Sequence, residues 1–565
     1  MSTTNFRARN FRARRVLVAL AASALFTTAL AAVPASAQDP SERPEPVLER
    51  NMRGEEAIRA LGDRLPDVAA QNGMTAVEFR AALRSDSMLW TDTSGQLLFV
   101  DEFTFGGDHD QDHSTTADPA WTSAAMPVGT NVWELESRPS AVRVIVLDFN
   151  GHDARGTAWG STSKQIAGAY DSDGDPTTFS QTEQEQIYSV WQRVAEDYAP
   201  FDVNVTTKDL PNSADGTGHP SIRRDETADQ NYGTRVVITP SQTYNCSCGG
   251  VAYVGVFPNV GADHDYYQPA WVFTGGVGTG AKNIAEAASH EAGHNLNLRH
   301  DGTRTTGYYT GHGDWAPIMG VGYYEPISQW SKGEYAGANN KEDDLVVMQM
   351  RDTSEVARGI GAVPDDVTSA VDVSTGTWQG MIGSANDTDS FTFTTTGGDV
   401  SLMARPAAMS ANLDIELRLF NGEGILWSTV DPPSDSSDGN DLTSGLDASL
   451  DAHLPGGTYT VVLDGVGFGD PASTGYSDYA SLGRDTLTVS IENNGYNGGG
   501  GGTTDPEPTV PAAPSGFSVT GGADGTATLG WSDNSNNELG FEIQREFLHR
   551  SGSFRGTTTW TVGID

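Results

Sequence analysis

The sequence predicts a multidomain protein in which an α/β domain is followed by all-β sandwich modules. A chain of 565 residues is too long for one hydrophobic core, so several domains are expected. Between residues 138 and 357, buried-strand patterns alternate with a helical pattern, which is typical of a sheet covered by helices. Beyond residue 362 the chain changes to short alternating strands separated by Gly, Asp and Ser, which is typical of a β-sandwich.

The N-terminus has the order of a secretory signal. Five arginines precede an apolar run over residues 16–33, and the small residues Ala35-Ser36-Ala37 follow. We expect cleavage after Ala37 and a secreted, extracellular product with no membrane attachment. The apolar run is slightly long for a signal, so an uncleaved membrane anchor is the alternative.

The charge balance argues against one class of partner. The chain has 34 Lys and Arg against 75 Asp and Glu, a formal net charge of −41. Such a surface repels a polyanion, so no nucleic-acid partner is expected.

Residues 38–137 are expected to form a propeptide, because they lie between the signal and the α/β domain. Thr75 and Glu78 have the spacing of a capping box that opens a helix through Leu83. A short strand is predicted over residues 97–100, before an acidic stretch at 108–118.

The α/β domain begins with a buried-strand pattern at residues 142–149. A helix is predicted over residues 182–198, with Thr182 and Glu185 as its capping box. Four strands are predicted next, at 202–207, 235–239, 251–257 and 270–274. A second helix then begins near Gly280. Cys246 and Cys248 are the only cysteines; a local disulfide is favoured over two free thiols.

The chemistry is expected in the helix after Gly280, at His290, Glu291 and His294. Histidines at i and i+4 lie on one helix face, so both imidazoles can reach one metal ion with Glu291 beside them. His300 is the predicted third ligand, and Asn297 is suited to the left-handed turn that brings it back. Zn²⁺ suits three imidazoles and a position left open for water.

This spacing resembles that of the metzincin metallopeptidases, and Asp301 after the third histidine is most like the reprolysin (adamalysin) branch. Met319, in Pro317-Ile318-Met319-Gly320, corresponds to the methionine turn of that clan. The resemblance covers residues 141–350 and departs from the family at Asn297, where a glycine is usual. It implies a mixed twisted sheet with a zinc-binding helix, and a secreted zinc metalloendopeptidase.

The site also predicts a mechanism and a mode of substrate binding. The ion would activate water and polarise the scissile carbonyl, while Glu291 moves the proton to the leaving amine. By the same resemblance, protein or peptide substrates would add as a strand at 251–257. His312, Tyr323 and Tyr324 lie near the methionine turn, but none is assigned to the oxyanion.

Two further ligand hypotheses concern acidic residues. The segment 38–137 contains no cysteine, and Phe105-Gly106-Gly107-Asp108 resembles the motif by which astacin propeptides place an aspartate on zinc. Asp108 is therefore the candidate inhibitory ligand of a zymogen. The run 171–175 offers oxygen ligands for Ca²⁺, with a plain acidic turn as the alternative.

The C-terminal modules also carry resemblances. Residues 362–493 resemble the bacterial pre-peptidase C-terminal domain, and residues 513–565, with Trp531, resemble the front half of a fibronectin type III domain. They are candidates for contact with a polymer or matrix. The predicted division is signal 1–37, propeptide 38–137, peptidase 138–357, sandwich 362–493, Gly/Pro-rich linker 494–512 and partial module 513–565.

Two other functions are compatible with the sequence. The β modules of an adhesin or matrix-binding protein could use the metal domain as a scaffold, although such a protein would be expected to lose Glu291 or a ligand. A zinc amidase acting on cell-wall material would need the same catalytic residues, so only its substrate distinguishes it from a peptidase.

Overall fold

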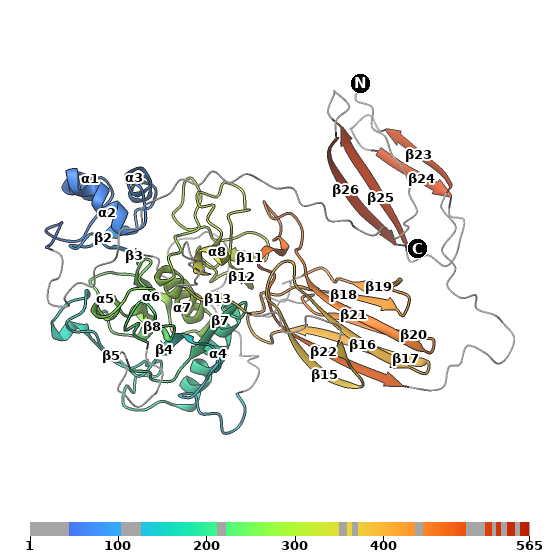
Figure 1. Ribbon diagram of the computed structural model, residues 1–565, viewed down its shortest axis with the longest axis horizontal. Helices are drawn as coiled ribbons and strands as arrows, with labels where there is room; N and C mark the ends of the chain where they lie inside the picture. The colour runs from blue at the N-terminus through green and yellow to red at the C-terminus, as the bar shows by residue number, and fades with distance from the viewer. Residues whose placement is uncertain are drawn as a thin grey trace. The chain divides into compact units, whose positions relative to one another are not determined.

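The computed structural model describes residues 45–102, 126–211, 222–349, 359–363, 371–434, 445–492, 515–521, 527–532, 540–548 and 554–563 (Figure 1). The predicted signal peptide, the linker at 494–512 and Asp108 lie outside these residues. The larger compact unit is Ala37–Gly498, and strands β23–β26 belong to a separate unit. Among the described residues, none of the helices has the length and apolar content needed to cross a membrane.

A nine-stranded mixed sheet organises the N-terminal part of the larger unit. In spatial order it consists of β1 (Met52–Arg53), β2 (Leu89–Thr91), β3 (Leu97–Asp101), β9 (Gly250–Tyr253), β10 (Ala270–Phe273), β8 (Tyr232–Thr239), β4 (Arg143–Asp148), β7 (Phe201–Thr206) and β13 (Gly361–Ala362). The four strands from β10 to β7 are parallel to their neighbours, and the strands outside them pair antiparallel. All residues of β4 and β8 are buried, as expected for parallel strands covered on both faces.

Two long helices, α4 (Gln181–Asp197) and α7 (Ala281–Asn295), pack against this sheet and against each other. The Tyr198 hydroxyl, directly after α4, donates to the carbonyl of Ser289 in α7 at 2.8 Å. The prediction of helix α4 is confirmed, but its predicted cap is wrong. Ser180 and Glu183 form the capping box, because Glu183 is buried and accepts from the Ser180 backbone at 2.9 Å.

The shorter elements connect these parts. They are η1 (Gly62–Arg64), β5 (His152–Asp153), η2 (Ser163–Gln165), β6 (Ile166–Ala167), α5 (Ala262–Tyr266), α6 (Thr274–Val277), β11 (Trp315–Pro317), β12 (Ile327–Gln329), α8 (Asp344–Gln349) and η3 (Asp478–Ala480). Cys246 and Cys248 form the predicted local disulfide.

Residues 45–102 form a small layer that joins the large sheet. It contains α1 (Gly54–Leu61), α2 (Leu65–Gln71) and α3 (Ala76–Ser85), at the blue end of the chain in Figure 1. The predicted capping box of Thr75 and Glu78 is confirmed at the start of α3. Leu61, Leu65, Phe79 and Leu83 lie in one buried cluster beneath these helices.

Strand β3 covers one edge of β9, which the sequence did not predict. Strand 251–257 was expected to present a free edge, but β9 stops at Tyr253, and β3 pairs with it antiparallel from Leu98↔Tyr253 to Asp101↔Gly250. The expectation of a free edge is therefore wrong for the chain that contains residues 97–101, because these residues cover that edge; peptide binding there stays a prediction.

Two sheets facing one core form the next module, as the alternating pattern predicted. One sheet contains β14 (Val371–Asp372), β16 (Thr388–Thr395), β21 (Gly457–Gly465), β18 (Ile415–Asn421) and β19 (Leu426–Val430). The other contains β15 (Gly376–Ile382), β22 (Gly483–Glu492), β17 (Gly398–Pro406) and β20 (Ala448–Leu454). Alternate residues such as Leu417, Leu463 and Leu487 are completely buried between them.

Polar contacts fasten this sandwich to the α/β domain. Arg484 Nη1 of β22 lies 2.9 Å from a carboxylate oxygen of the buried Glu196 in α4. The side-chain amide of Asn412 donates to Asp197 at 3.1 Å, and the Tyr479 hydroxyl donates to Asp343 at 2.7 Å. The two modules therefore share buried polar groups.

The separate unit contains β23 (Ser515–Gly521), β24 (Ala527–Ser532), β25 (Gly540–Leu548) and β26 (Phe554–Gly563), which pair as two hairpins. Trp531 lies in β24 and is half-buried. The all-β character predicted for residues 513–565 is thus present in the described strands.

Candidate metal centre

Helix α7 carries His290 and His294 on one face, and its end returns the chain to that face. The N–H of Asn297 donates to the His294 carbonyl at 2.9 Å, and the N–H of Leu298 donates to the Gly293 carbonyl at 3.0 Å. These two bonds form a Schellman motif, which needs a left-handed residue after the cap. Asn297 has a φ of 79°, so the predicted turn at Asn297 is confirmed, although the helix itself ends at Asn295.

The three predicted histidines converge, and each has its outer ring nitrogen occupied. His290 Nδ1 lies 2.8 Å from the Ile318 carbonyl, and His294 Nδ1 lies 2.9 Å from the Leu298 carbonyl. His300 Nδ1 lies 2.7 Å from a carboxylate oxygen of Asp86, at the end of α3. Such partners fix the ring orientation and leave Nε2 as the ligand atom.

The inner nitrogens face a fourth residue that the sequence analysis missed. Asp101, the last residue of β3, places its carboxylate oxygens 3.4 Å from His290 Nε2, 3.8 Å from His294 Nε2 and 3.2 Å from His300 Nε2. Ligands bound about 2.1 Å from one tetrahedral ion lie roughly 3.4 Å apart, so this separation suits a shared ion. Asp101, His290, His294 and His300 form a candidate metal-binding cluster.

Buried polar atoms also indicate that this cluster suits a metal ion. Apart from the contacts with Asp101 just given, the three Nε2 atoms, Asp101 Oδ1 and Glu291 Oε2 are buried with no hydrogen-bond partner among the described residues. Leaving such groups unsatisfied costs free energy, whereas a cation would satisfy them together. The donor set of imidazoles and one carboxylate suits a borderline ion such as Zn²⁺.

Electrostatics within the centre differ between the histidines. Burial lowers the pKa of His294 to about 4. Burial acts in the same direction on His300, but the carboxylates of Asp86 and Asp101 outweigh it and raise the pKa of His300 to about 9. A bound dication would need neutral Nε2 atoms, so it would displace the proton from His300.

Glu291 lies beside the cluster and is 1% exposed. Burial first, and then the neighbouring Asp101 carboxylate, raise the pKa of Glu291 well above its usual value. The backbone of Gly250 in β9 runs so close that a Cβ there would overlap the Glu291 carboxylate. Position 250 therefore fixes where this side chain can lie.

If Glu291 is the base of a metal-dependent hydrolysis, Gly250→Ala is expected to reduce that activity by about a hundredfold, because displacing a positioned catalytic group by roughly 1 Å has an effect of that size. The metal content should stay near that of the wild type, since no ligand changes. Gly275→Ala is the matched control, because its Cβ would meet only ordinary contact at 3.7 Å. Equal activity of the two variants would contradict this role of Gly250.

Met319 lies beneath helix α7, at the methionine turn that the sequence predicted. It is fully buried, and a Cβ on Gly293 would lie 2.8 Å from its sulfur atom. The N–H of Asp301 donates to the Met319 carbonyl at 2.8 Å. Met319 thus supports both the helix and the loop that carries His300.

Two tyrosines border the centre. The ring centroid of Tyr308 lies 4.4 Å from that of His300, and burial followed by the Asp101 charge raises its pKa well above the usual value. Burial and then Asp101 and Glu291 act in the same way on Tyr323. Tyr323 was a candidate from the sequence, whereas Tyr308 was not, because nothing local distinguishes it from Tyr309 and Trp315 between His300 and Met319. His312 instead directs Nε2 at the Gly475 carbonyl of the sandwich, which accepts the hydrogen bond at 2.9 Å.

The acidic run at 171–175 forms a turn. Asp171, Asp173 and Glu183 can bring carboxylate oxygens within 4.8 Å of one another. However, Asp171 already accepts backbone N–H bonds from Asp173 and Gly174, and Glu183 caps α4. Calcium binding there stays a prediction.

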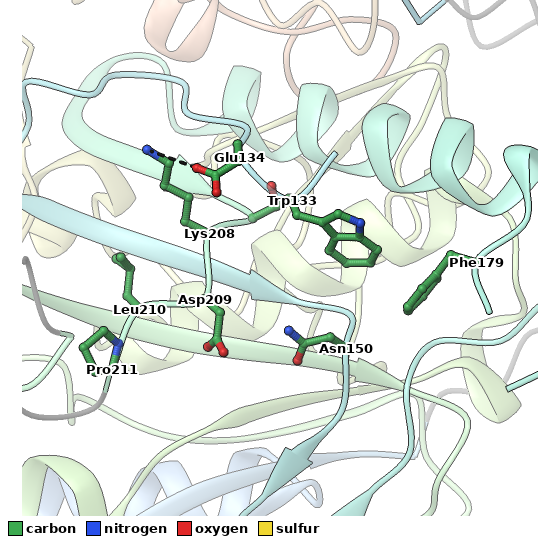
Figure 2. A pocket seen from close by; sticks show the side chains of 9 residues that line it. Trp133, Glu134, Asn150, Phe179, Lys208, Asp209, Leu210 and Pro211 are labelled. Carbon is green, nitrogen blue, oxygen red and sulfur yellow. Dashed lines mark ion pairs between the residues drawn. The ribbon is translucent and has the colours of Figure 1, made fainter. Parts of the chain in front are cut away.

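A pocket of about 740 Å³ lies elsewhere, near the carboxyl ends of β4 and β7 (Figure 2). It is lined by Trp133, Glu134, Asn150, Phe179, Thr207, Lys208, Asp209, Leu210 and Pro211. Lys208 pairs with Glu134 at 3.6 Å, and Asp209 pairs with Arg235 at 3.2 Å. Its charges are paired within the protein, and none of its lining residues belongs to the metal cluster.

Comparison with known proteins adds little to this picture. No protein-family model matches the sequence, and no curated protein matches it. A solved pre-peptidase C-terminal domain of a collagenase from Bacillus anthracis is similar to part of the chain, with 12% identity, a TM-score of 0.16, and coverage of 23% of this chain and 100% of that chain. A score of this size carries no conclusion about fold or function, so the site must be interpreted from its own geometry.

Proposed function

We propose that the chain is the precursor of a secreted zinc metalloendopeptidase of the metzincin type. The observation that carries the proposal is the convergence beside Glu291 of three buried Nε2 atoms that have no hydrogen bond among the described residues. The Schellman turn at Asn297 and the buried Met319 beneath Gly293 support the resemblance to that clan. His290, His294 and His300 would hold the ion.

The substrate class follows from the strand beside the site. Strand β9 runs past Glu291, and the edge that faces away from β10 pairs antiparallel with a second strand, β3. An extended peptide offers the same backbone donors and acceptors as β3. This favours a peptide substrate over the amidase alternative.

The residues of the chain then divide the chemistry. A bound Zn²⁺ would supply a Lewis acid that polarises the scissile carbonyl and acidifies water. Glu291 would take a proton from water and deliver it to the leaving amine, and its buried position beside the three histidines suits this exchange. The backbone of β9 aligns the peptide beside Glu291.

The test compares the secreted wild type with Glu291→Ala. We expect about one zinc per chain in both proteins and at least about a thousandfold lower cleavage of casein and of a peptide library in the variant. Purified cell-wall material is assayed in parallel. Wild-type protein that has been processed, holds zinc and cleaves no peptide would rule out the endopeptidase, and cleavage of cell-wall amides alone would identify the amidase.

A further inference from the structure

We propose that residues 45–102 are an intramolecular inhibitor. In it, Asp101 is the fourth metal ligand, and Asp86 binds the outer ring nitrogen, Nδ1, of His300. The inference rests on the proposed function, because it assigns the regulation of the same site. It replaces Asp108, chosen from the sequence, by a residue that the fold places at the centre.

Strand β3 occupies the position that a peptide would need. It pairs with β9 over four residues, and the other side of β9 is already paired with β10. The N–H of Gly249 donates to the Asp101 carbonyl at 2.9 Å, and the N–H of Val254 donates to the Leu97 carbonyl at 2.9 Å. A substrate strand cannot use this edge of β9 while β3 is bound there.

The Asp101 side chain closes the metal centre itself. Its carboxylate lies 3.2 to 3.8 Å from all three Nε2 atoms, which is where water and the scissile carbonyl must come together. It also lies next to Glu291, so the catalytic base faces another carboxylate in place of a water molecule. A carboxylate ligand in this position excludes both reactants.

Phe99 covers the same centre from β3. Its ring centroid lies 4.3 Å from that of His294 and 3.9 Å from that of His300, and its side chain is 1% exposed. The inhibitor therefore removes two of the imidazoles from water. A low-dielectric cover strengthens the attraction between the carboxylate and a cation.

Asp86 gives the inhibitor a second effect on the metal. His290 and His294 direct Nδ1 at the Ile318 and Leu298 carbonyls of the domain itself, whereas the Nδ1 partner of His300 belongs to residues 45–102. A carboxylate on the outer nitrogen makes an imidazole a stronger ligand, and losing it costs about 10–100-fold in metal affinity. The precursor should therefore retain zinc more tightly than a form from which this segment has left.

The test uses the uncleaved full-length chain with Asp101→Ala, Asp101→Asn and Asp86→Ala, and Asp67→Ala as the control on an exposed position of α2. Zinc release to a coloured chelator is measured together with cleavage of a fluorogenic peptide. We expect zinc release at least about tenfold faster in the Asp101 and Asp86 variants. The Asp101 variants should also cleave peptide at least tenfold faster than the uncleaved wild type, because β3 without its metal ligand leaves the edge of β9 more readily. Asp101→Asn preserves the shape of the side chain and guards against misfolding of the alanine variant.

Zinc release and peptide cleavage distinguish a failure of this inference from a failure of the proposed function. Zinc release that is unchanged in both Asp101 variants would overturn the ligand assignment, whether or not the protein is a peptidase. Uncleaved wild type that is as active as processed protein would overturn inhibition. By contrast, faster zinc release in the variants with no peptide cleavage by any form would support the inhibitor as a metal ligand and contradict the proposed function.

Discussion

His294→Ala is expected to lower the zinc content to less than about a tenth of the wild-type value and to abolish peptide cleavage. The metal supplies much of the free energy that holds such a site together, and removing one imidazole leaves two histidines for it in the processed form of the proposed peptidase. His294 is fully buried between Phe99 and the other ligands, so the variant also loses packing at the centre. Zinc analysis after dialysis and a thermal melt with and without added zinc measure both effects.

The same substitution can be compared between the uncleaved precursor and the processed form. Because Asp101 can serve as a ligand there, His294→Ala should lose less zinc affinity in the uncleaved chain than in the processed enzyme. His453→Ala, on an exposed position of β20, is the matched control and should keep its full zinc content. Full zinc loading of His294→Ala in the processed form would show that the histidine cluster is not the metal site.

Arg484→Ala is expected to destabilise the larger unit by about 2 kcal/mol at pH 8. Glu196 is 1% exposed on its side chain and depends on Arg484 of the sandwich, so the variant leaves a buried carboxylate without its cation. Breaking a fully buried pair costs roughly 3–5 kcal/mol, and the 39% exposure of the Arg484 side chain reduces that value. Urea denaturation, compared with the exposed control Arg405→Ala, measures the difference.

The pH dependence of this defect has a definite sign. Burial raises the pKa of Glu196 above its ordinary 4.5, although Arg484 opposes the shift. An acid with a raised folded pKa destabilises the fold increasingly as the pH rises above 4.5, and without Arg484 that penalty grows. The defect of Arg484→Ala should therefore shrink as the pH falls from 8 towards 5. A defect that is constant over this range, or that persists fully in Glu196→Gln, would assign the effect to packing.

Much of the fold could be predicted because its signals are local. The apolar periodicity of α4, the buried run of β4 and the alternation in the sandwich strands follow from neighbouring residues, and the structure has these elements within a few residues of their predicted bounds. The predicted cap of α4 was wrong because both Ser180 and Thr182 have a glutamate three residues later and could begin a capping box. Only the burial of Glu183 against the turn at Ser172 distinguishes them.

The sequence by itself determined the three histidines, Glu291 and the turn at Asn297, because helical spacing and a left-handed residue place these groups together without help from the rest of the chain. Only the tertiary structure decided what faces them. Asp86 is 214 residues away from His300 in sequence, and no local pattern distinguishes Asp101 from the acidic residues that follow it. The register of β3 on β9 makes that choice, since pairing Asp101 with Gly250 brings its carboxylate to the metal ligands. Strand register depends on contacts across the whole sheet, so the closure of the site was outside what the sequence alone could establish.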